Sequence, residues 1–216
     1  MLEKMDDFFS ARVDGYDEHM KRNIEGASLF YKYTASLLPK EKAADVLDLG
    51  CGTGLELEEY FELNPQAKVT GIDLTEAMLE SLKAKFPDKN IATICGSYFD
   101  VPFGEEVFDA AVSVESLHHF TKEEKVPLYT KLRKAIKPCG YFILTDYFAD
   151  SDEQEAFFRQ ELLRIRKEQS LAEGEFYHYD TPLTVEHEKE ALLAAGFTHV
   201  DEVGSWAATH TLKAIK

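Results

Sequence analysis

Basic residues are scarce in this chain. Its 216 residues include 24 Lys and Arg against 40 Asp and Glu, which gives a formal net charge of −16. A nucleic-acid-binding surface needs a basic footprint, and an anionic membrane attracts basic segments, so we expect neither partner. A small neutral or cationic substrate is compatible with this charge, and most of the acids are expected on solvated helix faces.

Cysteines and long apolar runs are also few. Three cysteines without a Cys-x-x-Cys pair make no disulfide framework, and this usage fits a reducing cytoplasm. No stretch reaches the ~20 apolar residues of a membrane helix. Residues 1–7 lack the apolar core of a signal peptide. We therefore expect a cytoplasmic protein, and the chain length favours one domain.

What the chain does have is an apolar run followed by three glycines at alternate positions, VLDLGCGTG at 46–54. The apolar residues fit a buried parallel strand. Gly50 allows a sharp turn, and Gly52 and Gly54 let a ligand approach the main chain before the next helix. Asp48 lies close to this loop, where its charge would repel a phosphate. The spacing and this acid therefore favour a nucleotide cofactor with a positive centre over a dinucleotide.

A second apolar strand, predicted at 68–72, also ends in an acid. Asp73 lies about where a nucleotide site places the carboxylate that binds the ribose hydroxyls. Leu74 could flank an adenine ring, and Thr75 fits the N-cap of the helix that follows. Taken alone, Asp73 is equally compatible with a plain acid before a helix. Its spacing from Gly54 favours the ribose interpretation.

Strand and helix patterns alternate along most of the chain. Apolar runs predict strands at 45–49, 68–72, 91–95, 108–113 and 140–146, and helical patterns fall at 17–38, 54–62, 75–85, 122–136, 151–171 and 184–195. Two final β-like runs, 198–204 and 207–215, are too close for a crossover and must form an antiparallel hairpin. We predict an α/β fold with a doubly wound, mostly parallel seven-stranded sheet, a C-terminal antiparallel hairpin and helices on both faces.

Several segments resemble the class I methyltransferases that depend on S-adenosyl-L-methionine (SAM). DLGCGTG at 48–54 resembles the family's first motif, and GSYFDVPF at 96–103 resembles its adenine segment, with Ser97 replacing the customary Asp. FDAAVSVESLHHF at 108–120 resembles the fourth strand and its turn. LRKAIKPCG at 132–140 resembles the turn into the fifth strand, with Cys139 replacing a glycine. The resemblance implies SAM as cofactor, S-adenosyl-L-homocysteine as product, and methyl transfer to a small-molecule acceptor by in-line displacement.

The resemblance also implies a division of the chain and a cofactor site. One methyltransferase domain over 1–216 would comprise a helical leader or lid at 1–40, a SAM-binding core at 41–146, a substrate-cover insert at 147–183, and a final helix and hairpin at 184–216. In this family a tyrosine of the leader often closes over SAM. The expected cofactor-binding residues are Asp48, Gly50, Cys51, Gly52, Gly54, Asp73, Leu74, Ser97, Tyr98, Phe99, Glu115 and Tyr16.

The leader and the turn after the fourth strand supply candidates for the acceptor site. We expect substrate contacts from His19, Ser116, His118 and Tyr147. His119 is a candidate general base if the acceptor must lose a proton, because imidazole titrates near neutral pH. We expect no metal, because adjacent histidines point in different directions and no third ligand is spaced to join them.

Other interpretations stay open. The region after the fifth strand, followed by LLAAGF at 192–197, loosely resembles the carboxy-SAM synthases, which build a modified cofactor. That chemistry needs a cation near the sulfonium, and the candidates are Arg159, Arg164 and Arg166. A SAM-binding protein without catalysis also fits, whereas an NAD-dependent enzyme fits the glycine spacing badly. The sequence leaves open the acceptor, the atom that is methylated, and whether the chain is a monomer or a homodimer.

Overall fold

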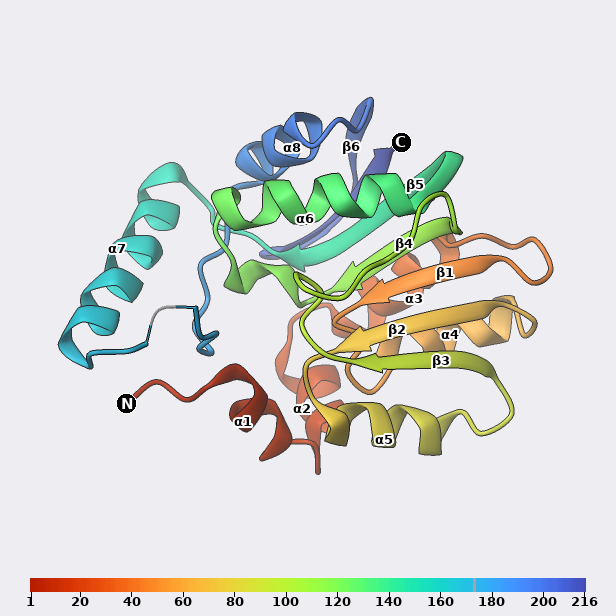
Figure 1. The fold of residues 1–216 in the computed structure, drawn as a ribbon, viewed down its shortest axis with the longest axis horizontal. Helices are drawn as coiled ribbons and strands as arrows, with labels where there is room; N and C mark the ends of the chain where they lie inside the picture. The colour runs from red at the N-terminus through yellow and green to blue at the C-terminus, as the bar shows by residue number, and fades with distance from the viewer. Residues whose placement is uncertain (173) are drawn as a thin grey trace.

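A seven-stranded sheet forms the centre of the computed structural model, which describes residues 1–172 and 174–216 (Figure 1). The strands lie in the order β3-β2-β1-β4-β5-β7-β6. Their bounds are β1 Asp45–Leu49, β2 Lys68–Asp73, β3 Asn90–Cys95, β4 Phe108–Val114, β5 Ile136–Tyr147, β6 His199–Trp206 and β7 Thr209–Ile215. Strands β1 to β5 pair in parallel, and β7 pairs antiparallel with both β5 and β6. The predicted sheet and its hairpin are confirmed.

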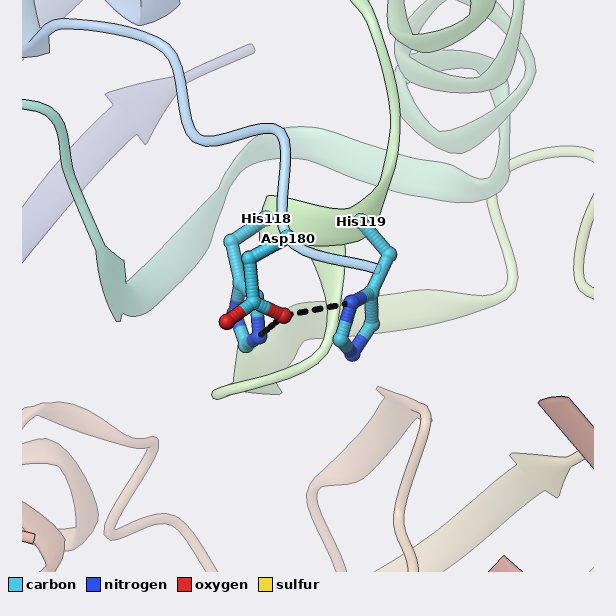
Figure 2. Close-up of side chains that lie close together, drawn as sticks. All are labelled: His118, His119 and Asp180. Carbon is cyan, nitrogen blue, oxygen red and sulfur yellow. Dashed lines mark ion pairs between the residues drawn. The ribbon is translucent and has the colours of Figure 1, made fainter. Parts of the chain in front are cut away.

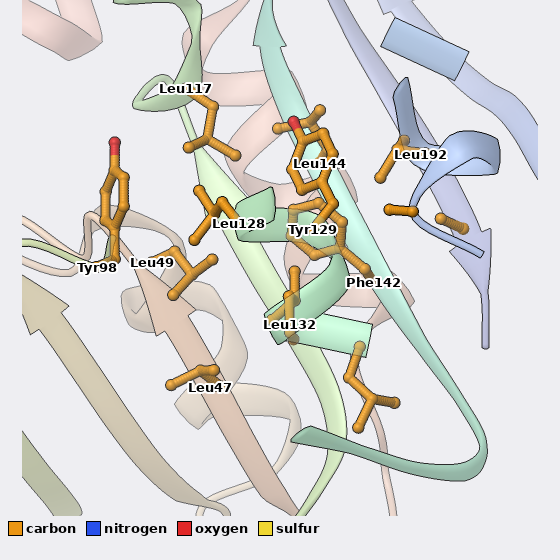
Figure 3. Close-up of a cluster of buried hydrophobic side chains, with 14 of the residues drawn as sticks. Leu47, Leu49, Tyr98, Leu117, Leu128, Tyr129, Leu132, Phe142, Leu144 and Leu192 are labelled. Carbon is orange, nitrogen blue, oxygen red and sulfur yellow. The ribbon is translucent and has the colours of Figure 1, made fainter. Parts of the chain in front are cut away.

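Helices cover both faces of the sheet, because successive side chains of each strand point to opposite faces. Leu47 and Leu49 of β1 share a core with Leu128 and Leu132 of α6 (Figure 3). Val46, adjacent to Leu47, belongs to the second core, under α3 and α4. The helices are α1 Met5–Ser10, α2 Tyr16–Asn23, α3 Ala27–Leu37, α4 Leu55–Leu63, α5 Glu76–Lys85, α6 Lys122–Ala135, α7 Asp152–Glu168 and α8 Val185–Ala194, with a 3-10 turn, η1, at Leu117–His119.

The amino-terminal leader differs from the single helix predicted over 17–38. It forms α1, α2 and α3, and the break between α2 and α3 falls at Gly26, whose φ is +79°. A Cβ on Gly26 would lie 2.7 Å from Cβ of Trp206, at the end of β6. The prediction of one helix was therefore wrong, because close packing against the C-terminal hairpin bends the chain there.

Strand β5 begins earlier than predicted. Ile136 already pairs with Phe108, and the register then shifts before Tyr141 pairs with Ala110. Within this irregular stretch Cys139 has a φ of +67°. The segment 138–140, predicted as a turn before the strand, is therefore an irregularity inside it, far from the carboxyl ends of the strands.

The carboxyl ends of β1 to β4 point toward α1 and α2 and toward the segment after α7 (Figure 1). We call residues 174–183 the cover segment. The backbone N–H of Met5 donates to the carbonyl of Phe176 at 3.0 Å, and the N–H of His178 donates to the carbonyl of Glu3 at 3.1 Å. Two segments far apart in sequence thus lie side by side over one end of the sheet. No described helix has the length and apolar character needed to cross a membrane.

Candidate functional site

The loop between β1 and α4 holds its glycines in left-handed backbone, with φ of +72° at Gly50, +48° at Gly52 and +75° at Gly54. A Cβ on Gly50 would lie 2.0 Å from Oγ of Ser116, so packing closes this position. A Cβ on Gly52 would have its nearest described neighbour at 3.9 Å, on the ring of Tyr16. The space beside the Gly52 main chain is therefore open to a ligand.

Asp73, at the end of β2, faces this loop. Its Oδ2 accepts the backbone N–H of Gly52 at 2.9 Å, and its Oδ1 accepts the N–H of Thr75 at 2.9 Å. Burial raises the pKa of Asp73, and these two backbone hydrogen bonds oppose that rise. An ionised carboxylate has about four lone-pair sites, so two stay available for hydroxyl donors of a ligand.

Two cavities meet at the carboxyl ends of the strands. The smaller, about 60 Å³, lies over the glycine loop and Asp73, and side chains of α1 and Phe176 help to line it. The larger, about 890 Å³, lies between the leader, the η1 turn and the β6–β7 turn. Four side chains line both cavities and mark where two ligands would meet: Phe9, Tyr16, Glu115 and His119.

Most of the residues predicted for the cofactor and acceptor sites line one of these cavities. The smaller cavity takes in Tyr16, Gly50, Gly52, Asp73, Leu74, Ser97, Tyr98, Glu115, Ser116 and His119. The larger takes in Tyr16, His19, Glu115, His118, His119 and Tyr147. The remaining four lie behind the walls: Asp48 and Cys51 are buried, Gly54 faces apolar side chains, and Phe99 packs on Phe120 and Phe176.

Buried carboxyl groups surround the glycine loop. The oxygens of Asp48 and one oxygen of Glu56 accept from no N–H or O–H donor among the described residues. The two carboxyl groups instead lie close enough to hydrogen-bond each other when one is protonated. Burial, and then the nearby charge of Glu56, raise the pKa of Asp48 well above its usual value. Glu115 lies in left-handed backbone at the end of β4, and burial raises its pKa to about 7. With these raised pKa values the groups are largely protonated and uncharged, and a positively charged ligand group nearby would stabilise their ionised forms, whereas a phosphate would not.

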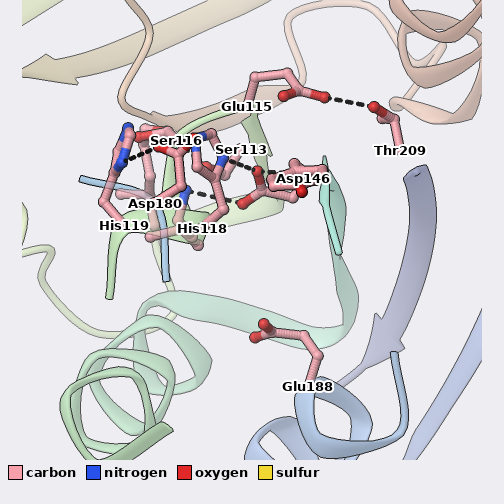
Figure 4. A network of polar contacts seen from close by, with 12 residues as sticks. Ser113, Glu115, Ser116, His118, His119, Asp146, Asp180, Glu188 and Thr209 are labelled. Atoms are coloured by element: carbon pink, nitrogen blue, oxygen red, sulfur yellow. Dashed lines mark hydrogen bonds and ion pairs between the residues drawn. The ribbon is translucent and has the colours of Figure 1, made fainter. Parts of the chain in front are cut away.

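His118 is held by a buried carboxylate. Its Nδ1 lies 2.5 Å from Oδ1 of Asp146, whose Oδ2 accepts the N–H of Leu117 at 2.8 Å (Figure 4). Burial alone would lower the pKa of His118, but the charge and hydrogen bond of Asp146 outweigh it and raise this pKa to about 9. His118 is therefore protonated at neutral pH.

His119 lies beside His118, but its pKa is shifted in the opposite direction. The ring centroids are 4.1 Å apart, and Nδ1 of His119 lies 3.1 Å from Oδ1 of Asp180 and 3.3 Å from the carbonyl oxygen of Tyr179 (Figure 2). Burial and the charge of His118 lower the pKa of His119 below its usual range. A neutral imidazole thus stands next to a charged one.

The histidine pair does not diverge as predicted. The tight η1 turn brings both rings onto Asp180, with Nε2 of His118 at 3.6 Å from the same Oδ1. The three donor atoms lie within 4.8 Å of one another, so the expectation that no third group joins them was wrong. Such a set could hold a divalent cation, but here its atoms form ion pairs with one another.

Several residues at this site were not singled out from the sequence. Phe9 comes from α1, which had no recognised helical pattern, and Asp180 comes from the cover segment. Asp146 lies at the end of β5, much as Asp73 ends β2, so its place near the end of a strand was the available signal. For Phe9 and Asp180 no local pattern marked the position, because both depend on how two loosely patterned segments fold over the sheet.

Comparison with known protein families finds a methyltransferase domain over residues 46–140. The chain is 30% identical over 221 residues to a carboxy-S-adenosyl-L-methionine synthase of Wolinella succinogenes, covering 92% of this chain and 88% of that protein. It is 27% identical to 24-methylenesterol C-methyltransferase 3 of Arabidopsis thaliana, covering 68% of this chain and 41% of that protein. Against several curated relatives the chain spans only 26–46% of their length.

Solved structures share the fold. A putative O-methyltransferase of Nostoc punctiforme superposes with a TM-score of 0.73 at 21% identity, covering 100% of this chain and 62% of that one. Human N-acetylserotonin methyltransferase, solved in complex with SAM, superposes with a TM-score of 0.68 at 18% identity, covering 96% of this chain and 56% of that one. With the near full-length relative and the matching domain, these comparisons show that the chain belongs to the class I SAM-dependent methyltransferase family.

Proposed function

We propose that this chain transfers a methyl group from SAM to a small-molecule acceptor. The observation that carries the proposal is the meeting of two cavities at Phe9, Tyr16, Glu115 and His119. The smaller, about 60 Å³, lies over the glycine loop and would hold only part of SAM, whose remainder would extend into the larger cavity. The larger, about 890 Å³, has a volume in the range of small-molecule sites, about 300–1,000 Å³. Two ligands in these cavities would touch at those four side chains.

The residues of the smaller cavity suit SAM. Gly52 leaves its main chain open, Asp73 can accept from the ribose hydroxyls, and Leu74 and Tyr98 offer apolar surface to adenine. The carboxyl of Glu115 suits a cationic ligand. When bound, SAM supplies a methyl group already activated on a sulfonium. The protein then needs to orient the acceptor and exclude water, and such positioning can supply roughly 7–11 kcal/mol.

A small acceptor fits this chain better than RNA. Some relatives carry tRNA in their names, among them a tRNA (carboxymethyluridine(34)-5-O)-methyltransferase of Arabidopsis thaliana, 28% identical over 56% of this chain. The net charge of −16 opposes binding of a polyanion. We expect no change in fluorescence anisotropy of labelled tRNA at about 0.1 M salt, where such binding would normally show. Saturable binding would move the proposal to an RNA acceptor.

A second candidate is synthesis of carboxy-SAM, favoured by the relative that matches nearly the full chain. That product carries a carboxylate that calls for a cation. Arg159 pairs with Glu123 and Arg164 with acids of α7, and neither they nor Arg166 line the two cavities. Arg12, which does line the larger cavity, pairs with Glu3. The charged ring of His118 also lines the larger cavity, but Asp146 pairs with it. Because acids already engage the cations at the site, the site favours methyl transfer.

Calorimetric titration with SAM, S-adenosylhomocysteine and NAD, with mass spectrometry of co-purified ligands, tests these alternatives. We expect micromolar binding of the first two and none of NAD. A co-purified mass of SAM plus a carboxyl group would establish the second candidate. Tight SAM binding without turnover of any acceptor would indicate a binding protein, and no SAM binding would refute the proposal.

A further inference from the structure

We propose that Asp180 and the carbonyl of Tyr179, both on the cover segment, position His119 with its Nε2 unprotonated, so that this nitrogen takes the proton of an acceptor hydroxyl. The inference rests on the proposed methyl transfer and names the class of acceptor group. His119 would be the catalytic base, and Asp180 a positioning residue that acts through it. The hydrogen bonds of Nδ1, the place of the ring and the charges around it support this assignment.

The hydrogen bonds of Nδ1 decide the tautomer. A carbonyl oxygen can only accept, so the 3.3 Å contact between Nδ1 and the Tyr179 oxygen is a hydrogen bond only when Nδ1 carries the hydrogen, which favours that tautomer. The Asp180 carboxylate, at 3.1 Å, favours the same choice. In the neutral ring Nε2 then has a free lone pair. Figure 2 shows Nδ1 turned to Asp180 and Nε2 at the far end of the ring.

The ring lies where a base is needed. His119 is one of the four residues that line both cavities, and its side chain is only 4% exposed. Its backbone belongs to the η1 turn, held by the bond from the N–H of Leu117 to Asp146. A proton acceptor at this position is shielded from water and borders the acceptor cavity.

The surrounding charges keep His119 neutral. Burial, and then the charged ring of His118 at 4.1 Å, lower the pKa of His119. The hydrogen bond and charge of Asp180, and the charge of Asp146, raise this pKa. Burial and His118 prevail, since the pKa of His119 falls below its usual range. His118 cannot serve instead, because Asp146 already holds it protonated.

The base depends on the position of the cover segment. The N–H of Thr181 donates to the carbonyl of His118 at 2.8 Å, next to Asp180. The other end of the segment is tied to the leader, where the ring of Phe8 stacks on His178 at 3.5 Å. The cover segment therefore lines the larger cavity through His178 and Asp180 and also positions His119.

A base of this kind serves an acceptor that must lose a proton. The oxygen lone pair of a hydroxyl forms the bond to the methyl carbon, the S–CH3 electron pair stays on sulfur, and the hydroxyl proton passes to Nε2 of His119 and then to solvent. A thioether or a tertiary amine already has a free lone pair and would gain nothing from His119. The inferred acceptor is therefore a group that gives up a proton on methyl transfer, and we take a hydroxyl as the case to test.

Long-range ¹H–¹⁵N NMR of protein labelled at histidine, saturated with S-adenosylhomocysteine, reads the tautomer without an acceptor. The His119 signals are assigned by their loss in His119→Gln. We expect the Nδ1–H form in the wild type and a substantial share of the Nε2–H form in Asp180→Ala. Asp201→Ala, which removes the exposed partner of His199 at 2.9 Å, is the matched control and should leave His119 unchanged.

A wild-type Nε2–H tautomer, an unchanged tautomer in Asp180→Ala, or Mn²⁺ binding at Nδ1 of His119 would overturn the inference. Failure of S-adenosylhomocysteine to bind would refute the proposed function instead, and calorimetry distinguishes that failure from a wrong tautomer.

Turnover gives a second test. With a phenol and a tertiary amine as probe acceptors, we expect turnover of the phenol only. His119→Gln should lower kcat at least about 100-fold at unchanged SAM affinity. Turnover of the amine alone would also overturn it.

Discussion

Gly50 and Gly52 lie in one loop, yet the space around them differs. Alanine at either position would have to adopt left-handed backbone, which costs about 1–2 kcal/mol of stability. Only at Gly50 would the new Cβ also meet Oγ of Ser116, at 2.0 Å. We expect Gly50→Ala to lower the free energy of unfolding by about 3 kcal/mol, and Gly52→Ala by about 1 kcal/mol.

Urea unfolding and calorimetry with S-adenosylhomocysteine measure the two effects separately. Gly52→Ala should lose at least about tenfold in affinity, which is ~1.4 kcal/mol, because the side chain enters the space left for the ligand. Gly174→Ala is the control, since that glycine also has a left-handed φ, +77°, and an added Cβ there would meet no described atom within 4 Å. Equal losses of stability at Gly50 and Gly52 would contradict this interpretation of the loop.

Asp73 has two tasks that one substitution removes together. It accepts the amides of Gly52 and Thr75. In the proposed function it would also accept hydrogen bonds from a ribose. We expect Asp73→Ala to weaken SAM binding by about 10–100-fold and also to lower the melting temperature, since two backbone amides lose their acceptor. Glu80→Ala, an exposed change on α5, is the control. Unaltered SAM affinity would remove Asp73 from the site.

At the residue scale, the sequence was informative where chemistry is local. The glycines and Asp73 are recognisable because a turn, an acid and a strand end stand within a few positions of one another. Asp180 is not recognisable in this way, since its segment meets His119 across about 60 residues of chain. The same holds for Phe9, whose position depends on how the leader meets the cover segment.

At the scale of elements, the strands were predicted within one or two residues wherever apolar runs are bounded by turns. The exceptions arose from long-range packing. The helix predicted over 17–38 is broken at Gly26 because Trp206 packs there, and no periodicity in the leader encodes that contact. The early start of β5 at Ile136 likewise reflects pairing with Phe108.

Helices α6 and α8 are joined by a buried ionic group. Nζ of Lys125 lies 2.5 Å from Oε2 of Glu188, both side chains are 1% exposed, and the hydroxyl of Tyr129 donates to the other oxygen. Lys125→Met or Glu188→Leu alone should cost about 3–5 kcal/mol in the free energy of unfolding, because one charge stays buried and unpaired. The double variant should be only ~1–2 kcal/mol less stable than the wild type, because no charge is then left unpaired. The remaining loss is the cost of leaving the Tyr129 hydroxyl without a partner.

The same two helices provide the control for this cycle. Lys122 and Glu190 pair at 2.5 Å, but their side chains are 34% and 61% exposed. Lys122→Met should therefore cost no more than about 1 kcal/mol. Additive losses in the Lys125 and Glu188 double variant, measured by urea unfolding, would show that the pair is not coupled as the structure indicates.

At the scale of the whole molecule, the buried ionisable groups set how stability varies with pH. The pKa of His118 rises from 6.5 to about 9 on folding, so its contribution is complete below pH 6.5 and is lost as pH rises through 9. The pKa of Glu115 rises from 4.5 to about 7 on folding, so this group lowers the stability progressively as pH rises from 4.5 to 7. His178 has the opposite sign, because its folded pKa of about 4 destabilises the protein as pH falls below 6.5.

These opposing signs predict a melting temperature that is highest near pH 6 and falls by at least about 5 °C toward pH 9. The net charge of −16 also adds repulsion at high pH, but salt screens exposed charges and leaves a buried pair largely unaffected. Scans at about 0.3 M salt therefore isolate the contribution of His118 and Asp146. His118→Gln should be less stable at pH 6 and should lose most of the decline between pH 6.5 and 9. A wild-type melting temperature that stays flat over that range would mean that His118 is not held protonated by Asp146.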